Sequence, residues 1–209
     1  MAEWAMAALV LLGAYALGCA NGAYYLVRLR TRQDLRALGS GNAGARNAGR
    51  VLGRAGFTSA LVLDALKGIV VVLGSRALGA NDAVTAFAAS SVVIGHIWPA
   101  QLGFRGGKGA ATAIGVLAVY DVRVAAVVLV AGLLLLALTR RLMVGGFVAL
   151  VSAPVVASLF GHEIGAVAGI GTMTLAVVVA HRADVAVSVA QADAALNDVP
   201  DPTGTYASR

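Results

Sequence analysis

Long apolar runs separated by short polar stretches make up most of this chain. Seven runs are predicted to be membrane segments, because about 20 apolar residues in a helix cross the hydrocarbon core. The fourth has only eleven residues, and a rise of about 16 Å is too short for a full crossing. That run either tilts, extends, or packs as a half-span inside the protein, which would reduce the count to five or six. The runs cover Trp4–Val27, Phe57–Leu78, Ala83–Phe104, Ala110–Tyr120, Val124–Leu138, Leu142–Phe160 and Ile164–Ala180.

Basic residues gather in the loops at one end of these segments. Seven of the 16 Lys and Arg residues lie between positions 28 and 54, and further clusters follow at 105–109 and 139–141. Because positively charged loops stay in the cytoplasm, we expect the N-terminus outside and the C-terminus in the cytoplasm. The pattern therefore predicts an all-α, polytopic bundle of about seven segments in the inner (plasma) membrane.

Composition agrees with this assignment. The chain is 59% hydrophobic and 12% charged, with mean hydropathy +0.85, whereas soluble domains average about 25% charged residues. The net charge of +6 does not indicate nucleic-acid binding, because the basic residues sit in short loops. We expect residues 1–196 to form one integral-membrane domain and residues 197–209 a disordered tail. The first run lacks the basic start of a cleaved signal peptide and is expected to be retained.

Metal and disulfide chemistry find little support in the sequence. The one cysteine, Cys19, excludes an intrachain disulfide and a cysteine-only metal cluster. The three histidines, His96, His162 and His181, show no metal-ligand spacing. No GxSxG elbow and no HxxxxD run is present, so these two acyl-transfer signatures are missing. We predict neither a metal nor a cofactor.

The longest polar passage between the runs is 39–50, which reads GSGNAGARNAGR. Its four glycines let the backbone approach a ligand closely, and arginine forks suit phosphate or carboxylate. The passage predicts an anion-binding loop, although its composition equally allows a basic loop that only touches lipid headgroups. The candidate substrate-binding residues in it are Gly39, Ser40, Gly41, Asn42, Asn47 and Arg50.

A second glycine-rich passage follows the third run, with GHIWP at 95–99 and FRGGKGAAT at 104–112. Pro99 should end or bend the preceding helix. Amides of Gly106 and Gly107 beside Lys108 resemble a phosphate-binding turn. It is not a Walker A loop, because that motif needs Ser or Thr directly after the lysine, and Gly109 follows Lys108 here. Gly106, Gly107, Lys108 and Thr112 are candidate binding residues, and His96 is either structural or supports the site.

Asp64 and Lys67 lie three apart in the second run and therefore on one helix face. Ionisable groups inside a membrane are costly, usually paired and often functional. The spacing leaves two interpretations open, a structural ion pair and a pair that supports the site.

These stretches together resemble the PlsY family, the integral-membrane acyl-phosphate:glycerol-3-phosphate acyltransferases. Residues 39–50 fit its first motif, close to GSGNxGxxNxxR, and residues 95–112 fit its second, approximately GHxxPxxxxFxGGKGxAT, at every fixed position. Residues 63–68 resemble its DxxKG stretch. The third motif, HRxNIxRLLxGxE, is matched only in part: His181 and Arg182 agree, whereas Asp184 replaces the asparagine.

The resemblance implies direct transfer of an acyl chain from acyl phosphate to the 1-hydroxyl of glycerol 3-phosphate. The products would be lysophosphatidic acid and phosphate, without an acyl-enzyme. Ser40, Lys108 and His181 would be the catalytic residues. Ser40, Asn42 and Arg50 would hold the acceptor phosphate, and Lys108 with the Gly106 and Gly107 amides would hold the acyl phosphate. His181 would orient one phosphate, and Asp184 would support the site.

The expected partners are therefore the two substrates and membrane lipids, with no nucleic acid and no obligatory protein partner. Two other functions stay open on the sequence. One is a transporter or lipid-binding protein that keeps the anion site without transferring anything. The other is a family paralogue with a different acceptor or donor, which the departure at Asp184 makes plausible.

Overall fold

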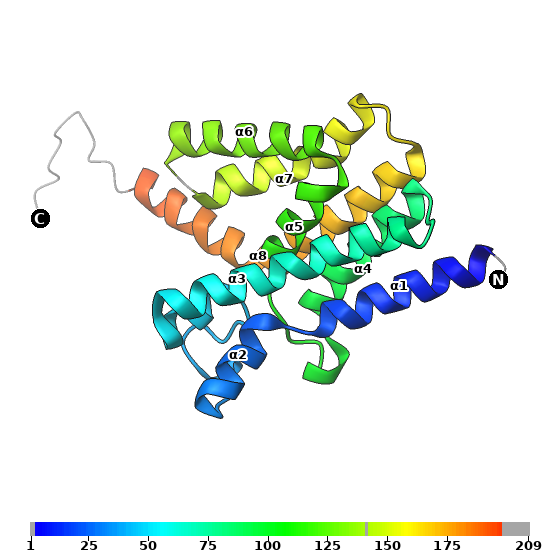
Figure 1. Ribbon diagram of the computed structural model, residues 1–209. Coiled ribbons are helices and arrows are strands. Elements are labelled where there is room, and N and C mark those ends of the chain that lie inside the picture. The colour runs from blue at the N-terminus through cyan, green and yellow to red at the C-terminus, as the bar shows by residue number, and fades with distance from the viewer. Residues whose placement is uncertain (1–2, 141, 198–209) are drawn as a thin grey trace, which may run out of the picture.

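The helices follow the predicted apolar runs closely, and the all-helical prediction is confirmed (Figure 1). The computed structural model describes residues 3–140 and 142–197, with side chains for residues 3–140 and 145–182. Within these residues, five spans are long and apolar enough to cross a membrane, and the apolar helix Ala110–Tyr120 and the apolar stretch Gly145–Leu159 of a further helix are shorter. The helices are α1 (Glu3–Cys19), α2 (Gly22–Thr31), α3 (Ala45–Ala77), α4 (Asp82–Ile97), α5 (Ala110–Tyr120), α6 (Val122–Thr139), α7 (Leu142–Leu159), α8 (Ile164–Asn197) and the 3₁₀ turns η1 (Leu35–Ala37) and η2 (Ala100–Leu102).

The first predicted segment is one span built from two helices. Asn21 separates α1 from α2 and caps α2, because its side-chain oxygen accepts a hydrogen bond from Tyr24 N at 2.8 Å. A backbone carbonyl without a partner costs several kcal/mol in hydrocarbon, and side chains from elsewhere satisfy those at the end of α1. Lys67 Nζ donates to Gly18 O (3.0 Å) and Ala20 O (3.3 Å), and Gln101 Nε2 donates to Cys19 O (2.6 Å).

The second segment begins earlier than expected. Helix α3 starts at Ala45, so the second half of the passage 39–50 is helical, and the prediction of a loop throughout it is wrong. Packing explains the early start, because Asn47 and Ala48 are buried in a small core with residues of α2 and η1. Gly53 interrupts the helix with φ 70° and ψ −163°, a conformation that is essentially restricted to glycine.

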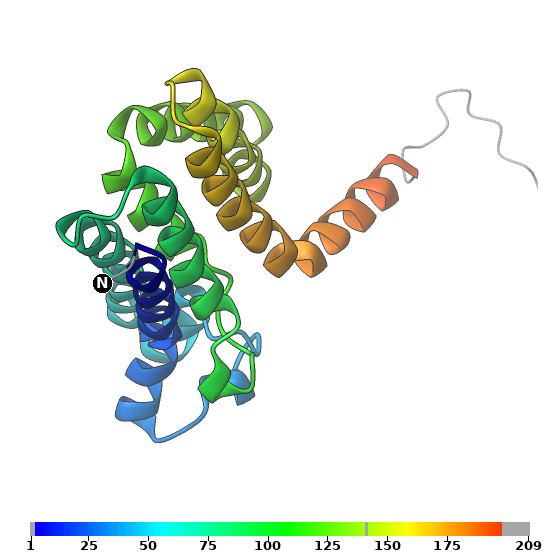
Figure 2. The same ribbon diagram turned by 90° about the vertical axis from the view of Figure 1, so that its right-hand side faces the viewer.

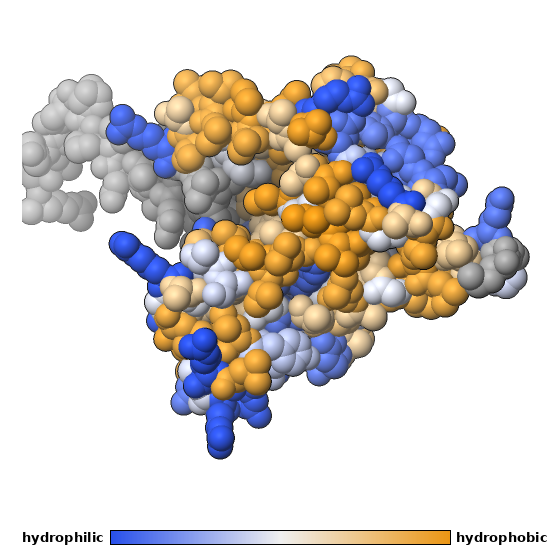
Figure 3. All heavy atoms as spheres, in the orientation of Figure 1, coloured by the Kyte–Doolittle hydropathy of each residue, from blue (hydrophilic) through white to orange (hydrophobic). Residues whose placement is uncertain are grey.

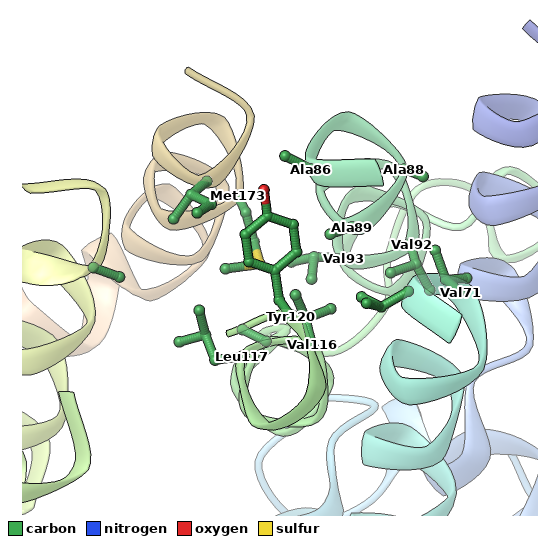
Figure 4. Close-up of a cluster of buried hydrophobic side chains, with 14 of the residues drawn as sticks. Val71, Ala86, Ala88, Ala89, Val92, Val93, Val116, Leu117, Tyr120 and Met173 are labelled. Carbon is green, nitrogen blue, oxygen red and sulfur yellow. The ribbon is translucent and has the colours of Figure 1, made fainter. Parts of the chain in front are cut away.

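Helix α4 ends at Ile97, two residues before Pro99, as the proline predicts. Helix α5 has the predicted bounds and packs inside the protein. Its side chains Val116, Leu117 and Tyr120 lie among residues of α3, α4 and α8 (Figure 4). The helices approach closely where glycines replace larger residues, as is usual in membranes. A Cβ would overlap backbone atoms of a neighbouring helix at Gly18, Gly68, Gly95 and Gly115.

Helices α6 and α7 (Leu142–Leu159) pack against each other, and α8 packs against α4 and α7 (Figures 1 and 2). Helix α8 is longer than the predicted segment 164–180, and Figure 2 shows that it bends sharply along its length. Apolar side chains cover much of the outer surface (Figure 3), which is typical of helices that face lipid. The predicted tail falls almost entirely in residues 198–209, outside the described residues.

A polar network joins the loops at the opposite end of the bundle from the glycine-rich passages. His162 Nδ1 lies 2.7 Å from Asp82 Oδ2, and its Nε2 lies 3.0 Å from Asp121 Oδ2. Arg123 pairs with Asp121 at 2.6 Å, and the Tyr120 hydroxyl donates to Asp82 at 2.9 Å. Since carboxylates only accept, both ring nitrogens of His162 must donate, so the ring is an imidazolium. The network ties the start of α4, the α5–α6 junction and the α7–α8 loop together.

We expect His162→Gln to lower the melting temperature more at about pH 6 than at about pH 9. Partial burial disfavours the imidazolium, but the hydrogen bonds to Asp82 and Asp121 outweigh it and raise the pKa of His162. Stabilisation from a raised pKa is complete below the ordinary value of about 6.5 and is lost as pH rises through the raised value. Thermal unfolding of both purified proteins across this range measures the difference. A difference that does not change with pH would contradict the charged network.

Candidate active site

The first glycine-rich passage is held in shape by Asn47. Its side chain is buried, and its Nδ2 donates to backbone oxygens on three sides, while its Oδ1 accepts from Ser40 N at 3.0 Å. These bonds use the polar atoms of the side chain within the protein, so Asn47 shapes the loop that carries Ser40 and Asn42. The carbonyl partners are Leu35 O (3.1 Å), Leu38 O (2.9 Å) and Asn42 O (3.0 Å).

Three predicted acceptor-binding side chains gather around this loop. Ser40 and Arg50 are exposed, and Asn42 is half-buried. Arg50 lies against the loop, because its Cδ is 3.6 Å from the position that a Cβ on Gly39 would take. The Asn42 side-chain oxygen lies beside Gly44, at the start of α3. Hydroxyl, amide and guanidinium groups are therefore grouped where α3 begins.

The two glycine-rich passages touch each other. Ala43 N donates to Gly106 O at 3.4 Å, and an Arg36 guanidinium nitrogen donates to Leu102 O. The loop before α3 and the loop before α5 therefore form one surface.

The backbone of the second passage is fixed by the end of α4. Gly107 N donates to His96 O at 3.1 Å, and Gly106 N donates to Ile97 O at 3.0 Å. These bonds satisfy carbonyls that a helix end leaves without partners. The expected anion-binding pair of amides is therefore already used, and we assign Gly106 and Gly107 to shaping the turn. A Cβ on Gly107 would overlap the His96 ring, so only glycine allows this approach.

The starts of two helices present other backbone amides near this surface. Gly44 precedes α3 and Gly109 precedes α5, and neither has a side chain that caps its helix. The first amides of an α-helix have no partner within the helix, and together with the helix dipole they favour a bound phosphate or carboxylate. The joined loops thus present two helix N-termini, with Arg50 and the half-buried Lys108 close in sequence to them.

Beneath the second loop lies a buried ionic cluster of Asp64, Lys67 and His96. Their residues are 1%, 5% and 3% exposed. Lys67 Nζ is 3.2 Å from Asp64 Oδ1 and 2.7 Å from His96 Nδ1. An ammonium can only donate, so His96 Nδ1 accepts and the ring proton is on Nε2, which faces Gly107. The cluster links the broken end of α1 to the turn that carries Lys108.

Sequence and structure comparisons identify the family. The profile of the glycerol-3-phosphate acyltransferase family matches residues 8–191. The chain belongs to the glycerol-3-phosphate acyltransferase family. It is similar to glycerol-3-phosphate acyltransferase 1 of Desulfitobacterium hafniense, with 39% identity over 84% of this chain and 87% of that protein. The enzyme of Thermoanaerobacter pseudethanolicus shares 37% identity over 72% and 75% of the two chains.

Solved structures of this family share the fold. Two crystal structures of PlsY, an integral membrane glycerol 3-phosphate acyltransferase, superpose with TM-scores of 0.79 and 0.77. They are 28% and 26% identical to this chain and cover 88% of it and 92% of their own chains. One is the glycerol 3-phosphate form and the other the lysophosphatidic acid form. The chain is therefore an integral membrane protein with several membrane helices.

The third motif of the family lies on α8. His181 is half-buried, its Nδ1 lies 2.8 Å from Val177 O, and its ring contacts Phe147 of α7 at 4.6 Å between centroids. The side chain of Asp184 lies outside the described residues. Thr112, in the first turn of α5, is fully buried, and among the described residues its hydroxyl has no hydrogen-bond partner.

Two features of this glycerol-3-phosphate acyltransferase were not predicted from its sequence. They are the helix starts without a capping side chain and the break between α1 and α2 at Asn21. The signal for the first was Gly44 and Gly109, each followed by an alanine-led helix without a capping side chain. The signal for the second was Asn21-Gly22 inside an apolar run, since asparagine is a common N-cap.

Proposed function

We propose that this protein is a glycerol-3-phosphate acyltransferase that takes its acyl chain from acyl phosphate. The observation that carries the proposal is the pair of uncapped helix starts in two touching loops, which offers places for two anionic groups. Membership of the family supports glycerol 3-phosphate as the acceptor. A reaction between two phosphorylated molecules needs this arrangement, because the protein must hold like charges close together.

The proposed reaction needs no covalent intermediate with the protein. The 1-hydroxyl oxygen of glycerol 3-phosphate attacks the carbonyl carbon of acyl phosphate, and the bond from that carbon to the bridging phosphate oxygen breaks. The hydroxyl proton passes to a phosphate oxygen, so the products are lysophosphatidic acid and hydrogen phosphate. The protein contributes positioning and stabilisation of the developing negative charge.

The roles of the side chains follow their positions in the two loops. Ser40, Asn42 and Arg50 hold the acceptor phosphate at the start of α3, with Gly39, Gly41 and Asn47 shaping that loop. Lys108 and the first amides of α5 hold the acyl phosphate, with Gly106, Gly107 and Thr112 shaping the turn. His181 orients one phosphate from α8, and Asp184 lies one helical turn further along.

An apolar groove next to the buried cluster suits the acyl chain. It has a volume of about 440 Å³ and opens between α1, α2 and α3, with Lys67 among its lining residues. Its walls are apolar side chains, and it lies beside the break between α1 and α2. We propose that the acyl chain lies here with its phosphate toward the second loop. The lining residues are Leu17, Ala20, Gly22, Tyr25, Leu26, Leu29, Leu63, Leu66, Lys67 and Val70.

We expect Leu66→Trp to shift the preference of the enzyme toward shorter acyl chains. A larger side chain would fill part of the groove, and pocket contacts of this kind change relative rates by about 10-fold or more. The measurement is the ratio of kcat/KM for a long and a short acyl phosphate. Leu129→Trp is the matched control, because Leu129 is an exposed leucine of α6 outside the groove. An unchanged ratio in Leu66→Trp would place the chain elsewhere.

We propose that the protein lies in the plasma membrane with seven segments, the N-terminus outside and the site in the cytoplasm. The arginines around the first loop support this orientation. Cysteines introduced at the exposed positions Ala37 or Arg105 in a Cys19→Ser protein should resist an impermeant thiol reagent on intact cells. Labelling by the reagent added outside would show that these loops face the outside of the cell.

The activity is tested with purified protein and labelled glycerol 3-phosphate. We expect lysophosphatidic acid with acyl phosphate, together with one phosphate released for each product molecule, and none with acyl-CoA or acyl carrier protein. Product from another donor would correct the donor assignment. Binding of glycerol 3-phosphate without product from any donor would favour a transporter or binding protein. Acyl transfer to a different acceptor would favour a paralogue, which the departure at Asp184 would help to explain.

A further inference from the structure

A hollow on α3 lies beside the proposed acceptor loop. It has a volume of about 470 Å³ and forms where Gly53 interrupts the helix. In a straight helix, arginines four and eight residues apart would form a row along one face. The interruption sets the turns before and after Gly53 at an angle and makes this surface concave. The lining residues are Arg46, Gly49, Arg50, Gly53, Arg54, Phe57 and Thr58.

The hollow has a strong and uncompensated positive charge. Arg46, Arg50 and Arg54 are all exposed, and in the described part of the chain none of them forms an ion pair. Arginine is more weakly hydrated than lysine and binds phosphate through a planar fork. Three such groups around one concave surface favour a ligand with a phosphate group.

The wall of the hollow that leads toward the middle of α3 is apolar. Phe57 is 41% exposed, and Leu61, one turn further along the same face, is 36% exposed. Figure 3 shows hydrophilic side chains over α2 and the N-terminal end of α3, and apolar side chains along the rest of α3. A soluble phosphate ester gains nothing from such a wall, whereas a lipid can place its headgroup on the arginines and a chain along Phe57 and Leu61.

We propose that this hollow binds the headgroup of an anionic phospholipid, separately from either substrate. Arg46 and Arg54 hold the headgroup phosphate at the membrane surface, and the exposed apolar face of α3 holds part of an acyl chain. Basic residues near an anionic membrane surface attract such lipids. Arg50 borders both the hollow and the acceptor loop, whereas Arg46 and Arg54 belong to the hollow alone.

Native mass spectrometry of the full chain, titrated with phosphatidylglycerol or phosphatidylcholine in detergent, tests the proposal. We expect the wild type to bind phosphatidylglycerol more tightly. Arg46→Gln with Arg54→Gln should weaken this binding by about 30-fold, the fold-change that corresponds to about 1 kcal/mol for each of two arginines. Arg28→Gln with Arg30→Gln is the matched control, because it removes the same charge from exposed positions of α2 outside the hollow.

Equal weakening by the control pair would overturn the proposal, since it would show a general effect of surface charge. Displacement of phosphatidylglycerol by excess inorganic phosphate or glycerol 3-phosphate would overturn it too and make the hollow a soluble phosphate site. Equal affinity for both lipids in the wild type would exclude anionic selectivity. The readout is binding, so it is independent of whether the protein transfers acyl groups, and a failure here is separate from a failure of the proposed activity.

Discussion

Replacement of Lys108 by alanine is expected to lower turnover by about 10²–10³-fold, the usual cost of losing one preorganised group that stabilises transition-state charge. Lys108 lies between Gly107, which is fixed on His96, and Gly109, which precedes α5. The backbone of the turn is held by the hydrogen bonds of Gly106 N and Gly107 N to the end of α4. The measurement is kcat with saturating substrates, together with the melting temperature of the purified variant.

The matched comparison is Arg50→Lys, which changes the other loop. A guanidinium on a phosphate is poorly replaced by an ammonium, so this variant should raise the KM for glycerol 3-phosphate more than it lowers kcat. Near-normal turnover in a well-folded Lys108→Ala protein would remove Lys108 from the mechanism. If Arg50→Lys raised only the KM for acyl phosphate, Arg50 would be assigned to binding the acyl phosphate instead.

Periodicity and charge were enough to locate the apolar helices. The bounds of α5 and the end of α4 follow directly from the run 110–120 and from Pro99. The early start of α3 could not be predicted this way, because it depends on burial of Asn47 and Ala48 against distant residues. Local composition around Gly49 and Gly53 indicates a loop, and tertiary packing overrides that preference.

The sequence was enough to propose residues for the site, but it could not show how they are hydrogen-bonded. Composition placed Arg50 and Lys108 in basic, glycine-rich passages. The comparisons show the family to which the chain belongs. Composition could not show that the Gly106 and Gly107 amides are used by the end of α4. Hydrogen bonds between segments that are far apart in sequence leave no local pattern, so the same glycines fit either role until the fold is known.

Replacement of Lys67 by methionine is expected to destabilise the protein by about 3–5 kcal/mol, the usual cost of removing one partner of a buried ion pair. The change leaves the Asp64 carboxylate buried without its cation and removes the donor to Gly18 O and Ala20 O. The measurement is reversible unfolding in a defined detergent or lipid mixture. Arg30→Met is the control, because exposed positions usually change stability by no more than about 0.5 kcal/mol.

A second replacement, at Asp64, separates the loss of stability caused by the unpaired charge from the loss caused by missing hydrogen bonds. If the uncompensated carboxylate causes most of the loss, Asp64→Leu with Lys67→Met should recover part of it, because apolar replacement of a whole buried pair is often tolerated. Recovery should stay incomplete, since the carbonyls at the end of α1 and the amide of Gly22 would still lack their partners. Full recovery would show that the break between α1 and α2 does not need the cluster. A Lys67→Met protein as stable as the wild type would show that the ion pair of Asp64 and Lys67 contributes little to stability.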